Sequence, residues 1–213
     1  MMNKHGFELS IGMVVTLILT ILIFSLSVYF LFNWFGKAKE LQAEIDRQTK
    51  EQIMTALTAG NQLVAIPIAI QQTKRGSWAA FGVGVRNIAS ETQFSMSTRF
   101  SGAYTPDGRE ICRTGDVCAD YIQEKWLGNF ATTPTFTLKK NEQKIIPLPV
   151  KAELNIAQGT QTTKGDYVFN VCVYDKPLRS DGAPPWPCTI AAFDEDSSVF
   201  YTGKIYQVTV KIV

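Results

Sequence analysis

The sequence predicts a long N-terminal transmembrane α-helix followed by an all-β immunoglobulin-like sandwich. Three observations predict this fold class. Residues 9–36 contain no charged residue, the chain after residue 61 alternates apolar and polar residues with a period of two, and all four cysteines lie in that second part. The 213 residues suffice for one membrane anchor and one domain of about 100–150 residues.

The apolar segment of residues 11–35 has the length of a membrane span, because about 20 helical residues cross a hydrocarbon core of roughly 30 Å. A buried core helix is the alternative, but core helices rarely run so far without a charge. A cleaved secretory signal has a shorter apolar core and a small-x-small cleavage motif, which is missing here. We therefore expect residues 7–36 to be retained as a transmembrane helix, with the lipid bilayer as its surroundings.

An amphipathic helical extension is predicted over residues 37–60. Leu41, Ile45, Ile53 and Leu57 lie on one i, i+4 row, and the remaining faces are charged. Gly60 and Asn61 give a helix stop signal. We expect one continuous helix from the membrane segment to this stop.

Residues 61–213 form the predicted β-sandwich domain. Short apolar segments separated by turn-rich loops are typical of such a fold. Pro67 restricts the first segment to a sheet edge or a bulge. Two loops are long, at residues 104–134 and 174–201. The seven expected strands lie in residues 63–70, 78–86, 94–100, 135–138, 145–150, 167–173 and 206–212.

The four cysteines predict two disulfides, because an even number of cysteines in a domain outside the cytoplasm is typical of a disulfide framework. Pairs close in sequence are favoured, namely Cys112–Cys118 and Cys172–Cys188. A zinc site is the alternative. Its ligands usually have two or four residues between paired cysteines, and the longer spacings here argue against it.

Two features of the sequence make conflicting predictions about which side of the membrane the C-terminal domain lies on. The positive-inside rule places the C-terminal domain inside, because four basic residues follow the apolar segment and only Lys4 precedes it. The cysteines and the β-rich composition instead favour an extracytoplasmic domain. We predict the extracytoplasmic location at the cell membrane. The four basic residues are Lys37, Lys39, Arg47 and Lys50.

Catalysis is not predicted, since the single histidine, His5, lies before the apolar segment and no nucleophile, metalloprotease or phosphate-loop motif is present. The net charge of +2 does not favour nucleic-acid binding. We expect no cofactor and no metal. The acidic residues 194–196 are a weak calcium candidate whose spacing fits no EF-hand loop. Trp186 either forms an exposed contact surface or packs beside the Cys172–Cys188 disulfide, and the second arrangement is commoner.

The N-terminal segment resembles the type IV pilin superfamily, including archaeal pilins and archaellins. Lys4, His5 and Gly6 before Phe7 are similar to the basic leader of these precursors, and residues 1–6 are the leader-like segment. The resemblance implies cleavage between Gly6 and Phe7. It departs from the bacterial pattern at the fifth mature position, where Ile11 replaces glutamate.

Two functions follow as hypotheses. The first is a pilin-like structural subunit of a surface filament, which self-associates through its N-terminal helix. Gly12, Thr16 and Thr20 are the predicted helix-packing residues, because small side chains on one row allow close helix contact. The second is a permanently anchored module that binds a cell-envelope protein.

Overall fold

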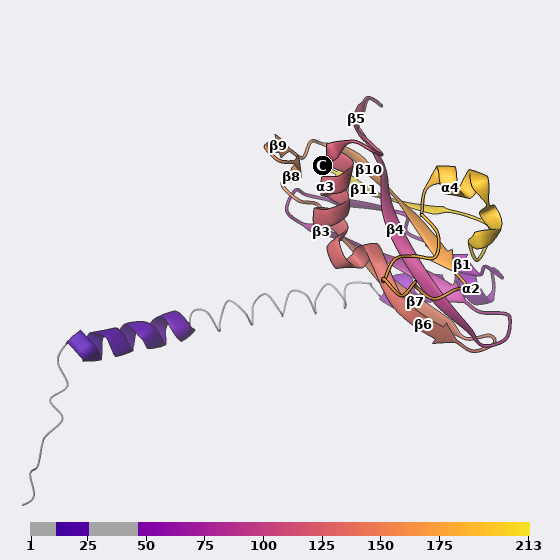
Figure 1. Cartoon of the computed structure of the whole chain (residues 1–213), viewed down its shortest axis with the longest axis horizontal. Helices are drawn as coiled ribbons and strands as arrows, with labels where there is room; N and C mark the ends of the chain where they lie inside the picture. Colours follow the sequence, from indigo (N-terminus) through magenta and orange to yellow (C-terminus); the bar gives the residue numbers. More distant parts are fainter. Residues whose placement is uncertain (1–11, 26–46) are drawn as a thin grey trace, which may run out of the picture. The chain divides into compact units, whose positions relative to one another are not determined.

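The computed structural model describes residues 12–25 and 47–213 (Figure 1). The chain divides between residues 43 and 44 into two units, and each is described by itself. The expected processing site, Gly6 and Phe7, lies outside the described residues. So do the leader-like segment of residues 1–6, residues 7–11 and 26–36 of the predicted membrane helix, and residues 37–46 of the predicted extension.

The described helix of the first unit covers residues 12–25. At about 1.5 Å per residue it is roughly 21 Å long, whereas a hydrocarbon core is about 30 Å thick. Of the helices in residues 12–25 and 47–213, none is long and apolar enough to cross a membrane. The predicted transmembrane helix, and with it the single-pass membrane description, is therefore wrong for the described chain.

The second unit is built on two main β-sheets (Figure 1). The three-stranded sheet has the order β1 (Val64–Ala65), β3 (Trp78–Arg86) and β7 (Gln143–Lys151). The six-stranded sheet has the order β2 (Ile70–Thr73), β11 (Tyr206–Ile212), β10 (Gly165–Tyr174), β4 (Thr92–Tyr104) and β5 (Glu110–Arg113), with β6 (Thr132–Leu138) also paired to β4. A hairpin of β8 (Asn155–Ala157) and β9 (Thr160–Gln161) stands apart.

The two sheets share one hydrophobic core. Alternation along β10 directs Tyr167, Phe169, Val171 and Val173 into this core, whereas Cys172 lies in a second cluster on the opposite face. The same period in β4 buries Phe94, Met96 and Phe100. The period-two pattern of the sequence therefore correctly predicts which residues of β10 and β4 face the core.

The chain changes sheets at Pro67. Before it, β1 pairs with β3 in the three-stranded sheet, and after it β2 pairs with β11 in the six-stranded sheet. Proline has no N–H to donate to a sheet, so a strand is readily interrupted there. Both flanking strands are edge strands, which confirms the prediction that Pro67 restricts this segment to a sheet edge or a bulge.

Helix α2 (Arg47–Thr58) packs on the outer face of the three-stranded sheet. Ile53 and Leu57 are fully buried, and the backbone of β3 comes close to them at Gly84. The Arg86 guanidinium donates a hydrogen bond of 2.8 Å to the Leu57 carbonyl near the end of the helix. The left-handed φ of 50° at Asn61 follows this end, so the helix stops where the sequence signals it.

The domain has mixed α/β content, and the predicted all-β immunoglobulin-like sandwich is therefore wrong. The first long loop contains α3 (Val117–Ile122), η1 (Gln123–Leu127) and η2 (Gly128–Ala131). The second contains α4 (Ile190–Glu195) and η3 (Ser197–Val199). These helices are too short to produce a recognisable 3.6-residue period, because only one or two turns face the core.

One of these short elements completes the six-stranded sheet. β6 pairs with β4 at Thr92–Ser97 and β5 pairs with it at Gly102–Tyr104, which leaves a gap between them. The Gln123 side chain fills this gap: its Oε1 accepts from the Phe100 N–H at 2.8 Å and its Nε2 donates to the Thr98 carbonyl at 3.0 Å. The glutamine amide thus substitutes for the missing strand.

Candidate functional site

The helix of residues 12–25 exposes its large apolar side chains on every face. Ten of them are between 43% and 68% exposed, from Val14 at the lower limit to Phe24 at the upper. Helices that are apolar all round are found buried in an apolar environment. Contiguous exposed apolar surface is typical of an interaction site, so this helix is the first candidate.

The predicted helix-packing residues form one row of the helix. The Thr16 hydroxyl donates to the Gly12 carbonyl at 2.6 Å, and the Thr20 hydroxyl donates to the Thr16 carbonyl at 2.7 Å. Because these hydroxyls have partners within the helix, burying the row leaves neither donor unsatisfied. The row combines small side chains with satisfied polar groups, which suits close contact with another helix.

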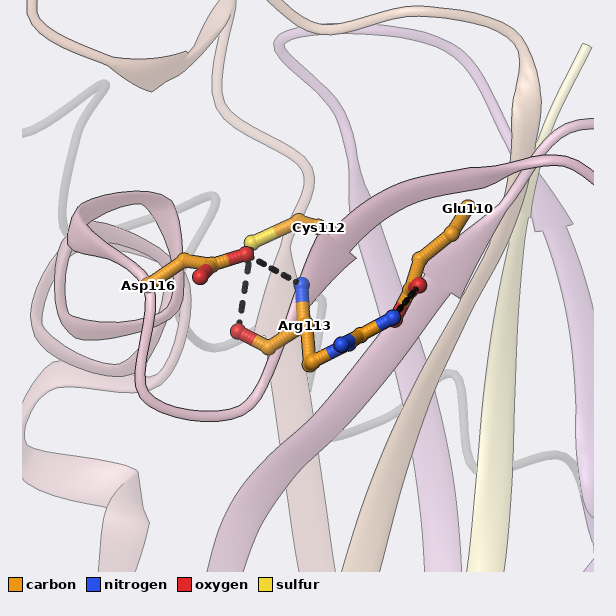
Figure 2. Close-up of polar contacts among 4 residues, drawn as sticks. All are labelled: Glu110, Cys112, Arg113 and Asp116. Atoms are coloured by element: carbon orange, nitrogen blue, oxygen red, sulfur yellow. Dashed lines mark hydrogen bonds and ion pairs between the residues drawn. The ribbon is translucent and has the colours of Figure 1, made fainter.

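The Cys112–Cys118 disulfide closes a small loop at the end of β5. Figure 2 shows how Asp116 and Arg113 hold this loop. The Asp116 carboxylate accepts from the Arg113 N–H at 3.0 Å, and the Asp116 N–H donates to the Arg113 carbonyl at 3.1 Å. The Arg113 guanidinium pairs with Glu110, which lowers the pKa of the Glu110 carboxyl and raises the pKa of the guanidinium.

A shallow cleft of about 260 Å³ lies beside this loop. The two sulfurs and the Asp116 carboxylate lie within 4.8 Å of one another. Zinc binds cysteine as a thiolate, whereas both sulfurs here are joined in a disulfide. The zinc alternative therefore has no thiolate ligand in this state of the protein.

The Cys172–Cys188 disulfide lies in a second apolar cluster with Tyr174 and Phe200. Tyr174 donates from its phenol to the Trp186 carbonyl at 2.7 Å, and its phenol oxygen lies 3.1 Å from the Ser97 hydroxyl. Burial raises the pKa of Tyr174 to about 12. Trp186 packs against this cluster and donates from its indole N–H to the Ala192 carbonyl at 3.2 Å. Trp186 therefore packs the loop against the Cys172–Cys188 disulfide, which is the second of the two arrangements predicted for it.

The acidic residues 194–196 take part in local structure. Asp194 and Glu195 belong to α4, and Asp196 caps η3 by accepting from the Ser198 N–H at 2.9 Å and from its hydroxyl at 2.6 Å. The two hydrogen bonds from Ser198 lower the pKa of the Asp196 carboxyl. Across residues 12–25 and 47–213, the group of possible metal ligands that converges is Cys112, Asp116 and Cys118. The weak calcium candidate thus has no converging carboxylates.

Three structural residues were missed by the sequence analysis: Gln123, Gly84 and Arg86. Nothing around Gln123 distinguishes it from a surface glutamine. A signal for Gly84 was present in the small residues that alternate with Phe81, Val83 and Val85 along β3. Such a pattern marks a sheet face that another backbone can approach closely.

The comparisons with known proteins identify no family. No protein-family model matches the chain, and no curated protein matches it. Among solved structures, the chain is similar to a family 123 glycoside hydrolase from Clostridium perfringens at 9% identity and a TM-score of 0.37, over 68% of this chain and 22% of that one. It is also similar to the Pseudomonas fluorescens alkylpurine DNA glycosylase AlkC at 10% identity and a TM-score of 0.37, over 75% and 33%.

A class 5 fimbriae chaperone, CfaA, matches at 13% identity and a TM-score of 0.32, over 70% of this chain and 56% of that one. The chain thus spans between about a fifth and just over half of these proteins. None of the three is a pilin, so they give the pilin-like description no support. At these scores the similarities carry no conclusion about activity, substrate or partner.

Proposed function

We propose that this chain is a non-catalytic structural subunit that assembles with copies of itself through the helix of residues 12–25. The disulfide-bonded β-domain is the part displayed, outside the cytoplasm, where disulfides persist. This is the self-associating, filament-type arrangement that the pilin resemblance of the N-terminal segment implies.

The observation that carries the proposal is the exposed apolar surface of this helix together with the row of Gly12, Thr16 and Thr20. Burial of one large aliphatic side chain contributes about 1.5–3 kcal/mol. Contact between identical helices removes many such side chains from water at once. The small row lets two backbones approach closely, and its hydroxyls already have partners.

The two disulfides support the proposal that the β-domain is exposed outside the cytoplasm. One disulfide restrains each of the two long loops, and each pair of cysteines is close in sequence. Cross-linking restricts the unfolded chain, which is how small extracytoplasmic domains commonly gain stability.

The test is substitution of Thr16 by leucine in the full chain, with Thr16→Ala as the matched control. Leucine adds bulk to the row, and overpacking typically costs about 1–3 kcal/mol at each contact, whereas alanine keeps the row small. Wild type and Thr16→Ala should sediment as an assembly without detergent and give ordered particles by electron microscopy. Thr16→Leu should lose both properties while keeping both disulfides.

If Thr16→Leu sediments like wild type, the row is not a packing surface. If wild type itself stays monomeric, the self-assembly proposal is wrong, and binding of an envelope partner by the β-domain becomes the better hypothesis.

A further inference from the structure

The edges of the two sheets differ in how they are protected. Just beyond the two ends of β7, the Asn87 N–H donates to the Glu142 carbonyl and the Ala152 N–H donates to the Ser77 carbonyl, each at 2.9 Å. The even-numbered residues of β7 therefore bond to β3, and the backbone groups of its odd-numbered residues point away from β3. Pro147 and Pro149 occupy two outward positions, so the free edge lacks donors there.

The other edges are also protected. β5 is short, carries Glu110 and Arg113 as an ion pair, and is joined to α3 by a disulfide. β6 contains Pro134, and the Thr135 hydroxyl accepts from the Leu178 N–H at 3.0 Å. β1 has only two residues.

β2 is as short as β5, and its Thr73 hydroxyl donates to the Trp78 carbonyl at 3.1 Å, but its free edge carries neither a proline nor a charged residue. Its sequence, Ile-Gln-Gln-Thr, contains no charge and no proline. The Thr209 N–H donates to the Ala69 carbonyl at 2.7 Å, and the Val213 N–H donates to the Thr73 carbonyl at 3.2 Å. By the same two-residue period, the backbone groups of Ile70 and Gln72 point away from β11. In the part of the chain that the structure describes, β11 is the one strand paired with β2.

We propose that the β2 edge is an interface that pairs with β2 of a second copy of this chain. The two strands run antiparallel about a twofold axis at Gln71. Ile70 of each copy then lies opposite Gln72 of the other, and both pairs exchange both of their backbone hydrogen bonds. Ile70, whose side chain is 63% exposed, gains a cross-strand neighbour on the outer face of the sheet.

The charges around β2 favour a second copy in this direction. Lys74 and Arg75 follow the strand, and residues 52–73 contain no charge at all. Antiparallel pairing about Gln71 places Lys74 opposite Ile68 and Arg75 opposite Pro67 of the other copy, so the two basic ends lie apart. Parallel pairing would place like charges side by side, which is destabilising.

A strand of this length buries less area than the roughly 1,000 Å² expected of a stable interface on its own. The pairing therefore rests on the proposed function in one respect: assembly through the helix of residues 12–25 brings copies together and raises their effective concentration. The β2 edge then sets how neighbouring domains are oriented.

The register makes the experiment specific. At the twofold axis, the two Gln71 residues form a non-hydrogen-bonded pair with Cα atoms about 4.5 Å apart. That separation lies within the range of about 4.4–6.8 Å that a disulfide bridges. Under mild oxidation, the full-length Gln71→Cys variant should therefore become a covalent dimer. The matched Gln72→Cys variant should not, because this position faces residue 70 of the other copy.

A second variant blocks the edge without changing the fold. Gln72→Pro removes an N–H that points away from β11, so the β2–β11 pairing persists while the new edge bond is lost. Added to Gln71→Cys, it should reduce the covalent dimer at least tenfold with the unfolding midpoint unchanged. An equal dimer yield at positions 71 and 72, or no dimer at either, would overturn the proposal, as would cross-linking of Gln71→Cys to a different protein.

Sedimentation separates this proposal from the proposed function. If wild type assembles and Gln71→Cys does not cross-link, the β2 interface is wrong and the helix-mediated assembly stands. If wild type does not assemble, the proposed function is wrong. Cross-linking of the detergent-solubilised chain near millimolar concentration then decides the β2 interface by itself: a dimer specific to position 71 supports it, and its absence refutes it.

Discussion

Replacing Gly84 with alanine tests how helix α2 is held against the three-stranded sheet. A Cβ at Gly84 would lie 2.2 Å from Cγ2 of Ile53 and 2.9 Å from Cδ1 of Leu57. Carbon atoms at their best separation are about 3.5–4.0 Å apart. Ile53 cannot turn its methyl group aside easily, because isoleucine has one strongly preferred χ1 rotamer in a helix.

We therefore expect Gly84→Ala to lower the free energy of unfolding by about 1–3 kcal/mol, the usual cost of overpacking. The assay is urea unfolding of the full chain, followed by tryptophan fluorescence. Met54→Ala is the control on the same helix, since the Met54 side chain is partly exposed. A surface change of this kind should stay within about 0.5 kcal/mol.

A double mutant makes the test stricter. Ile53→Ala alone should cost about 2–5 kcal/mol through the cavity it leaves. In combination, the methyl group added at Gly84 occupies part of that cavity, so the double mutant should be more stable than the sum of the single effects, by about 0.5–3 kcal/mol. Strict additivity, or a Gly84→Ala variant with the wild-type midpoint, would refute packing of α2 at Gly84.

Three further predictions concern the β-domain. Thr98→Val should raise stability by up to about 1 kcal/mol in urea unfolding, because the buried Thr98 hydroxyl has no hydrogen-bond partner among the described residues; a loss would show that the hydroxyl is bonded. Gln123→Leu should cost about 1–3 kcal/mol for each backbone group it leaves unpaired, and native-state hydrogen exchange at the Phe100 amide should accelerate, unlike at Phe169. Tyr174 has a pKa raised from 10.0 to about 12, so its neutral phenol is favoured in the folded state. Its contribution is complete below pH 10, is lost between pH 10 and 12, and amounts to about 3 kcal/mol. Tyr174→Phe should flatten that part of the alkaline stability curve, and an unchanged slope would contradict the assignment.

The sequence by itself determined the features that depend on short stretches of chain. Alternation in β10 gave the inward face of Tyr167, Phe169 and Val171 and the opposite face of Cys172, because successive strand residues point to opposite sides. The pairing of each cysteine with the other near it in sequence also followed from local spacing. The i, i+4 relation of Ile53 and Leu57 gave the buried row of α2.

Only the tertiary structure decided what these faces meet. Three such contacts join residues more than twenty positions apart in the sequence. They are the parallel pairing of β2 with β11, the hydrogen bonds of Gln123 to the unpaired part of β4, and the packing of α2 against Gly84. No local period encodes such contacts, because the same alternation fits several strand partners. The predicted membrane helix was wrong for the described residues, because apolar composition alone does not determine the length of a helix.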